Sequence, residues 1–202
     1  ELIDAGVHVV IASGNSYYKI DEPTGDDYNN QVDLGNGNET YHRGSSPYST
    51  EAFIVGNIDS TTTSISGTPR DKTAGSSCKG PGVNIWAPGT DIISSASGTT
   101  VFGASTGAYD DNFNLANISG TSMAAPQVAG MISLYAGLNP SATPTQVKAW
   151  FMSNAQDDKL FTTGLDNDYS NSRSLWNGPN KFAWNQYNAN KLIQGQFPTD
   201  PT

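Results

Sequence analysis

Residues 119–126 read Ser-Gly-Thr-Ser-Met-Ala-Ala-Pro and open a run of small and apolar side chains that continues to Leu138. Such residues occupy nearly every face of the run, so we expect a buried rather than an amphipathic helix. Pro126 is tolerated only in the first turn, which places the helix start at residues 121–123. Ser122 then lies where backbone N–H groups are unpaired and point outward, a position that favours negative charge.

Ser122 at a helix start can serve as a nucleophile. A tetrahedral intermediate formed on its hydroxyl would lie against its own backbone N–H. Gly120 lets the backbone approach closely at this point. Serine and threonine are also ordinary N-cap residues. A structural role would therefore explain an arbitrary Gly-Thr-Ser at a helix start.

The stretch is not arbitrary, because it resembles the nucleophile motif Gly-Thr-Ser-Met-Ala-x-Pro of the subtilisin-like serine proteases, or subtilases. Other blocks resemble the same family and follow in the family's order: Val9–Asn15, which ends in Ala-x-Gly-Asn, Ala52–Ile58, Val83–Ile92 and Thr143–Phe151. The loops 16–46 and 97–117 and the tail do not match closely.

The resemblance assigns roles to particular residues. It implies that Ser122 is the nucleophile and that Asn15 donates its side-chain amide to the oxyanion, with the Ser122 N–H as the second donor. Asn15 taken alone would fit a turn, and the serine motif favours the functional interpretation. The residues expected to contact the substrate, the first three as a wall of the pocket before the scissile bond, are Ala12, Ser13, Gly14, Gly120 and Thr121.

A serine hydroxyl needs a general base, and the base needs an orienting carboxylate. The family carries these in blocks of Asp-[Ser/Thr]-Gly and His-Gly-Thr-x-Val-Ala-Gly type, and neither block occurs in the chain. The two histidines, His8 in the first strand and His42 in a polar loop, lack that context. In subtilases both blocks precede the Ala-x-Gly-Asn strand. We therefore expect an N-terminal portion of the same protease to supply them, and this chain alone to be inactive.

Alternating strand, loop and helix patterns indicate an α/β protein. The resemblance implies a three-layer α/β/α sandwich with a mostly parallel sheet, incomplete in this chain. We expect residues 1–155 to form the C-terminal portion of the catalytic domain and residues 156–202 an extension that packs on it. Buried strands are expected at 7–12 and 52–58, short strands at 83–87 and 92–95 on either side of a turn, and a second helix at 143–155. Without the N-terminal portion the sheet has an open edge, so we expect order only beside that portion.

The 202-residue chain is acidic, with 10 Lys+Arg against 19 Asp+Glu and a net charge of -9. Phosphate contacts need lysine and arginine, which argues against a nucleic-acid partner. No apolar run approaches the roughly 20 residues of a membrane span, so we expect no membrane partner. The single cysteine, Cys78, excludes an intrachain disulfide framework. These features fit an extracellular or particle-associated setting.

No cofactor is required by this chemistry, and no site residue is expected to hold a metal. Calcium is nevertheless possible, because hard oxygen ligands crowd two loops and subtilases often bind Ca²⁺. A solvated acidic loop is the simpler interpretation, since the spacing fits no EF-hand. The two groups are Asp21, Asp26, Asp27, Asp33, Asn36 and Asn38, and Asp110, Asp111, Asn112 and Asn114.

The sequence thus predicts a serine endopeptidase of the subtilisin type, which hydrolyses peptide bonds of a polypeptide substrate through an acyl-enzyme on Ser122. The alternative is a catalytically inactive structural or interaction component that keeps a subtilisin-like fold. A lipase-like α/β hydrolase fails on its motif, because Gly120–Ala124 lacks the final glycine of Gly-x-Ser-x-Gly.

Overall fold

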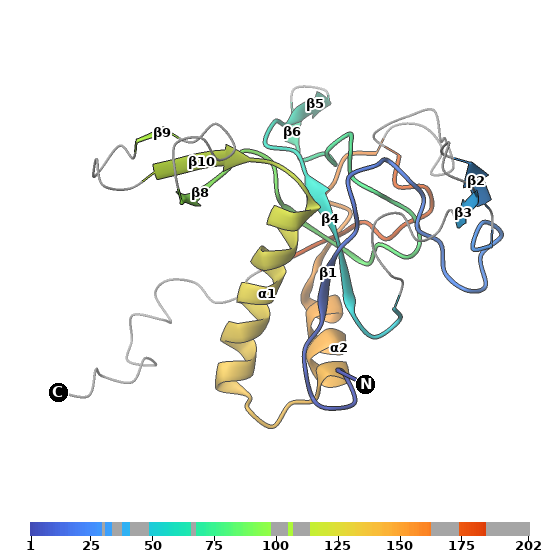
Figure 1. The fold of residues 1–202 in the computed structure, drawn as a ribbon, viewed down its shortest axis with the longest axis vertical. Coiled ribbons are helices and arrows are strands. Elements are labelled where there is room, and N and C mark those ends of the chain that lie inside the picture. The colour runs from blue at the N-terminus through green and yellow to red at the C-terminus, as the bar shows by residue number, and fades with distance from the viewer. Residues whose placement is uncertain are drawn as a thin grey trace.

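A five-stranded sheet forms the centre of the molecule (Figure 1). The computed structural model describes residues 1–29, 31–33, 38–40, 49–65, 68–97, 105–106, 114–162 and 174–184. In spatial order the strands are β1 (Val10–Ala12), β4 (Phe53–Ile58), β7 (Ile85–Pro88), β12 (Lys181–Phe182) and β11 (Gln156–Asp157). The first four run parallel, and β11 pairs antiparallel with β12. The mostly parallel sheet confirms the expected α/β class.

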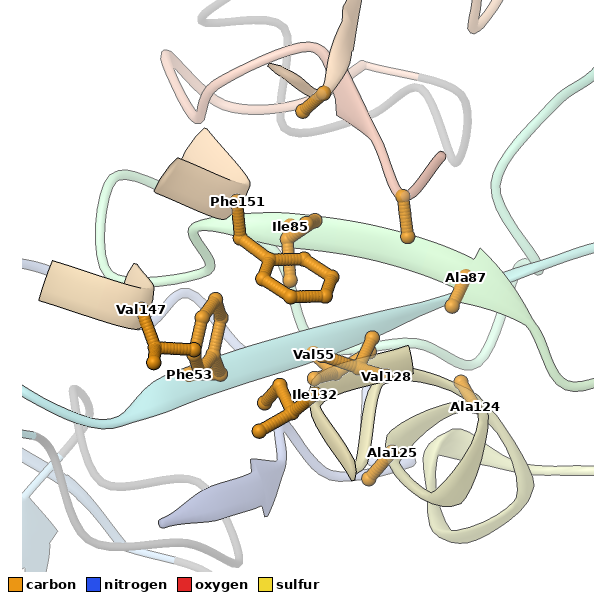
Figure 2. Close-up of a cluster of buried hydrophobic side chains, with 12 residues drawn as sticks. Phe53, Val55, Ile85, Ala87, Ala124, Ala125, Val128, Ile132, Val147 and Phe151 are labelled. Atoms are coloured by element: carbon orange, nitrogen blue, oxygen red, sulfur yellow. The ribbon is translucent and has the colours of Figure 1, made fainter. Parts of the chain in front are cut away.

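The helices α1 (Thr121–Leu138) and α2 (Pro144–Asn154) cover one face of this sheet. Their apolar side chains meet those of β4 and β7 in the cluster that Figure 2 shows, with Val55 and Ile85 opposite Val128 and Phe151. The other face carries a second cluster around Trp86. Among the described residues, irregular segments rather than helices cover that face. The described part of the sandwich is therefore incomplete, as expected.

Local sequence signals determine where both helices begin. α1 starts at Thr121, within the predicted range, and α2 has Pro144 in its first turn. The Thr143 hydroxyl accepts a hydrogen bond from the Gln146 N–H, and the Gln146 side chain accepts one from the Thr143 N–H. This reciprocal capping box satisfies two donors that a helix leaves open. Neither helix of the described chain combines the length and apolar character needed to cross a membrane.

The environment of α1 differs from the expected one. Its buried side chains, such as Val128 and Ile132, lie on the side that packs against the sheet. On its other sides Leu134 and Leu138 are 37% and 43% exposed. The expectation of burial on nearly every face is wrong for the described part of the chain, because the sheet covers only one side of the helix.

In the described part of the chain, three smaller sheets lie around the centre. β8 (Ile92–Ala96), β10 (Asn114–Ile118) and β9 (Ser105–Thr106) form one, and the two hairpins are β2 (Gln31–Asp33) with β3 (Asn38–Thr40), and β5 (Thr63–Ile65) with β6 (Thr68–Arg70). β10 lies largely in a stretch expected to be an irregular excursion. It pairs antiparallel with β8 and leads directly into α1 (Figure 1).

The described parts of the tail are built into the central sheet. β12 lies between β7 and β11, and the Trp86 indole N–H donates to the Pro179 carbonyl at 2.9 Å. The expected boundary at residue 155 thus falls between α2 and two strands of this sheet. Residues 185–202 of the expected extension lie outside the described residues.

A lysine links α2 to the beginning of β4. The Lys148 ammonium donates to the carbonyls of Thr50 at 2.6 Å and Ala52 at 2.7 Å, and it lies 5.9 Å from the centroid of the Phe53 ring. Burial lowers the pKa of Lys148, and the charges of Glu51 and Glu22 oppose this shift. The ammonium is held because it satisfies carbonyls that precede the strand.

We expect Lys148→Met to lower the free energy of unfolding by about 1 to 3 kcal/mol. The substitution keeps the packing of the side chain, but the Thr50 carbonyl loses the Lys148 donor and the Ala52 carbonyl keeps only the longer bond from Asn84 at 3.4 Å. Urea denaturation measures the difference. Lys159→Met, at an exposed position, is the matched control and should change stability little. Equal effects of the two substitutions would contradict this role of Lys148.

Candidate active site

The residues singled out by the sequence lie at the carboxyl ends of the parallel strands. β1 ends at Ala12 and continues into Ser13–Asn15, while α1 begins at Thr121 beside this segment. In open parallel sheets, ligands bind outside the carboxyl ends of the strands. The fold thus brings Asn15 and Thr121, 106 residues apart in sequence, into direct contact.

The Asn15 side chain is fixed by Thr121. Its Oδ1 accepts hydrogen bonds from the Thr121 N–H at 2.9 Å and from the Thr121 hydroxyl at 3.1 Å. The same hydroxyl accepts a hydrogen bond from the Gly14 N–H at 3.1 Å. A backbone N–H can only donate, so the amide atom that faces it is the oxygen. The Nδ2 group of Asn15 therefore remains a donor, and in the described part of the chain it makes no hydrogen bond.

Two glycines allow the close approach of these segments. A Cβ added to Gly120 would lie 3.2 Å from Asn15 Nδ2, so a side chain there would crowd the amide. A Cβ added to Gly89 would lie 2.6 Å from the Gly120 carbonyl oxygen. The Gly120 N–H donates to the Gly89 carbonyl at 2.8 Å. The turn after β7 thus holds the residue that precedes α1.

Ser122 is exposed at the second position of α1. In the described chain its N–H and its hydroxyl form no hydrogen bond, so a donor of the first helical turn stays open. A groove of about 500 Å³ lies beside it, lined by β8, β10 and the first turns of α1, including Met123 and Gln127. Among the described residues that line this groove, none carries a carboxylate, an imidazole or an amine. The described residues therefore place no general base beside Ser122.

Of the two histidines, His8 lies among the described residues, and it is not beside Ser122. His8 is partly buried at the amino end of the β1 segment, and its Nδ1 has no hydrogen-bond partner among the described residues. The strand β1 lies between His8 and Asn15, so the two residues lie at opposite ends of this strand. His42 lies outside the described residues.

The expected pocket wall is rigidly held. The Ser13 N–H donates to the Val55 carbonyl at 3.0 Å, and the Cys78 N–H donates to the Gly14 carbonyl at 2.8 Å. The Ser13 side chain is fully buried, and its hydroxyl donates to the Cys78 carbonyl at 3.3 Å. Ser13 is fully buried, backbone included, whereas Ala12 remains partly exposed. This support by the Cys78 backbone was missed in the sequence, because no pattern of residue types reveals it.

The first acidic group is organised around an amine. The Lys19 ammonium lies 3.1 Å from an oxygen of buried Asp21 and also pairs with Asp27. Burial alone would raise the pKa of Asp21, but hydrogen bonds from the Glu22 N–H, Lys19 and the Asp27 N–H lower it. Among the described residues, no three His, Cys, Asp or Glu side chains form a group that could hold a metal.

Much of the calcium prediction concerns other residues. The side chains of Asp33 and Asn38, and the whole of residues 36 and 110–112, lie outside the part of the structure that is described. Calcium binding stays a prediction.

Comparisons with known proteins agree on one family. The model of the subtilase family matches residues 2–172. Pen ch 18, a subtilisin-like serine protease from Penicillium rubens, is 30% identical over 193 residues, which cover 91% of this chain and 28% of that protein. The alkaline extracellular protease of Yarrowia lipolytica is 39% identical over 88 residues, which cover 41% of this chain and 16% of that protein.

A solved structure shows the same fold. Fervidolysin from Fervidobacterium pennivorans, a keratinolytic enzyme related to subtilisin, matches with a TM-score of 0.56 at 21% identity, covering 98% of this chain and 24% of that one. The chain spans 28% or less of the length of each of these three proteins.

A buried lysine lies in the loop that supports the site. The Lys79 side chain is fully buried, and its ammonium lies 5.4 Å from the centroid of the Tyr17 ring and 6.0 Å from that of Trp176. The backbone N–H of Lys79 donates to the Tyr18 carbonyl at 3.0 Å, and the backbone carbonyl of Lys79 accepts the Ile20 N–H at 2.7 Å. Burial lowers the pKa of Lys79 from 10.5 to about 8.

This shift predicts a pH dependence of stability. Between pH 8 and 10.5 the unfolded chain holds the Lys79 proton and the folded chain has lost it, so stability rises with pH in this window. Relative to Lys79→Met, the native protein should gain up to about 3 kcal/mol across the window. Denaturation curves at several pH values measure this. A difference between the two proteins that does not change with pH would contradict it.

Proposed function

The chain belongs to the subtilase family, and from this premise we propose that it carries the nucleophile and the oxyanion donors of a serine endopeptidase acting on polypeptides. The observation that carries the proposal is the bond from the Thr121 N–H to Asn15 Oδ1 at 2.9 Å. It holds a side-chain donor beside the residue that precedes Ser122.

The proposed reaction follows from this arrangement. The Ser122 hydroxyl attacks the scissile carbonyl while a base takes its proton, and the negative oxygen forms between Asn15 Nδ2 and the Ser122 N–H. Collapse expels the amine after it receives the proton, which leaves an acyl-enzyme that water then hydrolyses. In subtilisin, loss of the oxyanion-hole asparagine costs about 10²–10³ in kcat, a value that belongs to that enzyme.

The Asp and His of the triad are proposed to come from an N-terminal portion of the same protease. Two features support this. The described residues that line the groove beside Ser122 include no titratable group, and β1 is the edge strand of the described sheet. An edge strand offers backbone groups for pairing with a further strand, and the exposed leucines of α1 offer an apolar surface. The 202-residue chain alone is then inactive.

The location that we propose is extracellular or particle-associated. One relative carries the name alkaline extracellular protease. The acidic net charge of -9 and the single cysteine fit this setting.

An active-site-directed fluorophosphonate tests the proposed function. We expect the protease that contains this chain and its N-terminal portion to be labelled at Ser122. The serine oxygen displaces fluoride from the probe, and the tetrahedral phosphorus that results resembles the tetrahedral intermediate of a peptide substrate. The 202-residue chain by itself should not react. Peptide mass spectrometry identifies the labelled residue, and Ser122→Ala is the control. A folded protease that is not labelled would instead favour the inactive structural component.

The Thr121 hydroxyl gives a second prediction. Thr121→Val keeps the shape of the side chain but removes the group that joins the Gly14 N–H to Asn15. We expect kcat of the complete protease to fall by about tenfold or more with KM little changed, because the amide loses its orientation. Thr121→Ser keeps the hydroxyl and should retain most of kcat. Steady-state kinetics on a peptide substrate decide this, and a Val variant as active as the native protease would contradict it.

A further inference from the structure

A buried amide lies under the first turn of α1. Asn57 is at the carboxyl end of β4 and is 1% exposed. Alternate residues of a strand share a face, so its side chain lies on the same face as Phe53 and Val55, the face that α1 covers. An amide in an apolar environment is costly unless it is hydrogen-bonded. Its partners therefore indicate what this residue does.

The side chain of Asn57 contacts the turn that follows β7. Its Oδ1 accepts a hydrogen bond from the Thr90 hydroxyl at 3.3 Å. The same oxygen touches Gly89, where an added Cβ would lie 2.6 Å from it and 2.6 Å from the Gly120 carbonyl oxygen. The Asn57 amide thus contacts the turn after β7, and this turn contacts the N-cap residue of α1.

The backbone of Asn57 is fixed on its other side. Its N–H donates to the Ser77 hydroxyl at 3.0 Å, and its carbonyl accepts the Ala74 N–H at 2.9 Å. The Ser77 hydroxyl in turn donates to the Cys78 carbonyl. Asn57 therefore connects the loop that supports Gly14 with the turn that supports Gly120.

The turn after β7 holds the residues just before the nucleophile. The Gly89 carbonyl accepts the Gly120 N–H at 2.8 Å, and the Asp91 N–H donates to the Ser119 hydroxyl at 2.9 Å. The Gly120 carbonyl then accepts the Met123 N–H at 2.9 Å. A displacement of the turn would therefore move the first turn of α1.

We propose that Asn57 is a positioning residue for the reaction of Ser122. By holding the turn at Gly89 and Thr90, it keeps the start of α1 in the place where the Ser122 hydroxyl meets the Asn15 amide. This inference rests on the proposed function. It is distinct from a contribution to stability alone, because it requires an effect on the rate of the reaction.

Asn84 provides a matched control for Asn57. Its Oδ1 accepts the Ile54 N–H at 2.9 Å, and its Nδ2 donates to the Ala52 carbonyl at 3.4 Å. It is a side-chain amide that also contacts β4, but it does so at the amino end, away from Ser122. Its loss should lower stability without changing the site.

The experiment compares variants of the complete protease, each checked for folding by circular dichroism. In Asn57→Leu, which keeps the size of the side chain, we expect fluorophosphonate labelling and kcat to slow by about tenfold with KM within about twofold. Thr90→Val should also slow both labelling and kcat, whereas Thr90→Ser, which keeps the hydroxyl, should react at nearly the native rate. The double variant Asn57→Leu with Thr90→Val should be no slower than the slower single variant. Asn84→Leu should react at the native rate.

The outcomes separate the two proposals. If the native protease is labelled and folded Asn57→Leu is labelled equally fast, Asn57 has no positioning role while the proposed function stands. If Asn57→Leu does not fold, Thr90→Val carries the same test. If the native protease is not labelled, the proposed function fails. The positioning role then fails with it, because that role concerns the rate of the Ser122 reaction. Where the native protease is labelled, exchange at the Gly120 and Thr121 amides should be faster in Asn57→Leu than in Asn84→Leu, and equal exchange would overturn the inference.

Discussion

The contact on which the site depends is the one between the Asn15 amide and the start of α1. Gly120, the N-cap residue, has no side chain with which to cap the helix. Asn15 performs this task from the end of β1 by accepting the Thr121 N–H at 2.9 Å. One amide thus uses its oxygen to cap the helix and keeps its Nδ2 as a donor. The atom that caps the helix and the proposed oxyanion donor therefore belong to the same side-chain amide.

The rest of the described fold serves to hold the two sides of this contact. β1 pairs with β4, and in the loop that follows β6 the Cys78 N–H donates to the Gly14 carbonyl. On the other side, the turn after β7 receives the Gly120 N–H. α1 is then anchored by its apolar side against β4 and β7, as Figure 2 shows. Two adjacent parallel strands therefore position the helix start, and β1 beside them positions the amide.

The sequence predicts the features that depend on local chemistry. Pro126 determines where α1 begins, and Thr143 with Pro144 determines where α2 begins. The apolar run of β4 predicts that this strand is buried on both faces. Features that depend on distant partners were not predictable. β12 has two residues and is a strand only because it pairs with β7 and β11. The exposure of α1 depends on what covers it, and the inward direction of Ser13 depends on the Cys78 carbonyl.

The most direct measurement is a crystal structure of the complete protease with a peptidyl boronic acid bound. The boron should be bonded to the Ser122 hydroxyl oxygen, with one boron oxygen about 2.7–3.1 Å from both Asn15 Nδ2 and the Ser122 nitrogen. Asn15 Oδ1 should still face the Thr121 N–H. A boron oxygen directed to solvent, or an Asn15 amide that has left Thr121, would contradict this account of the site.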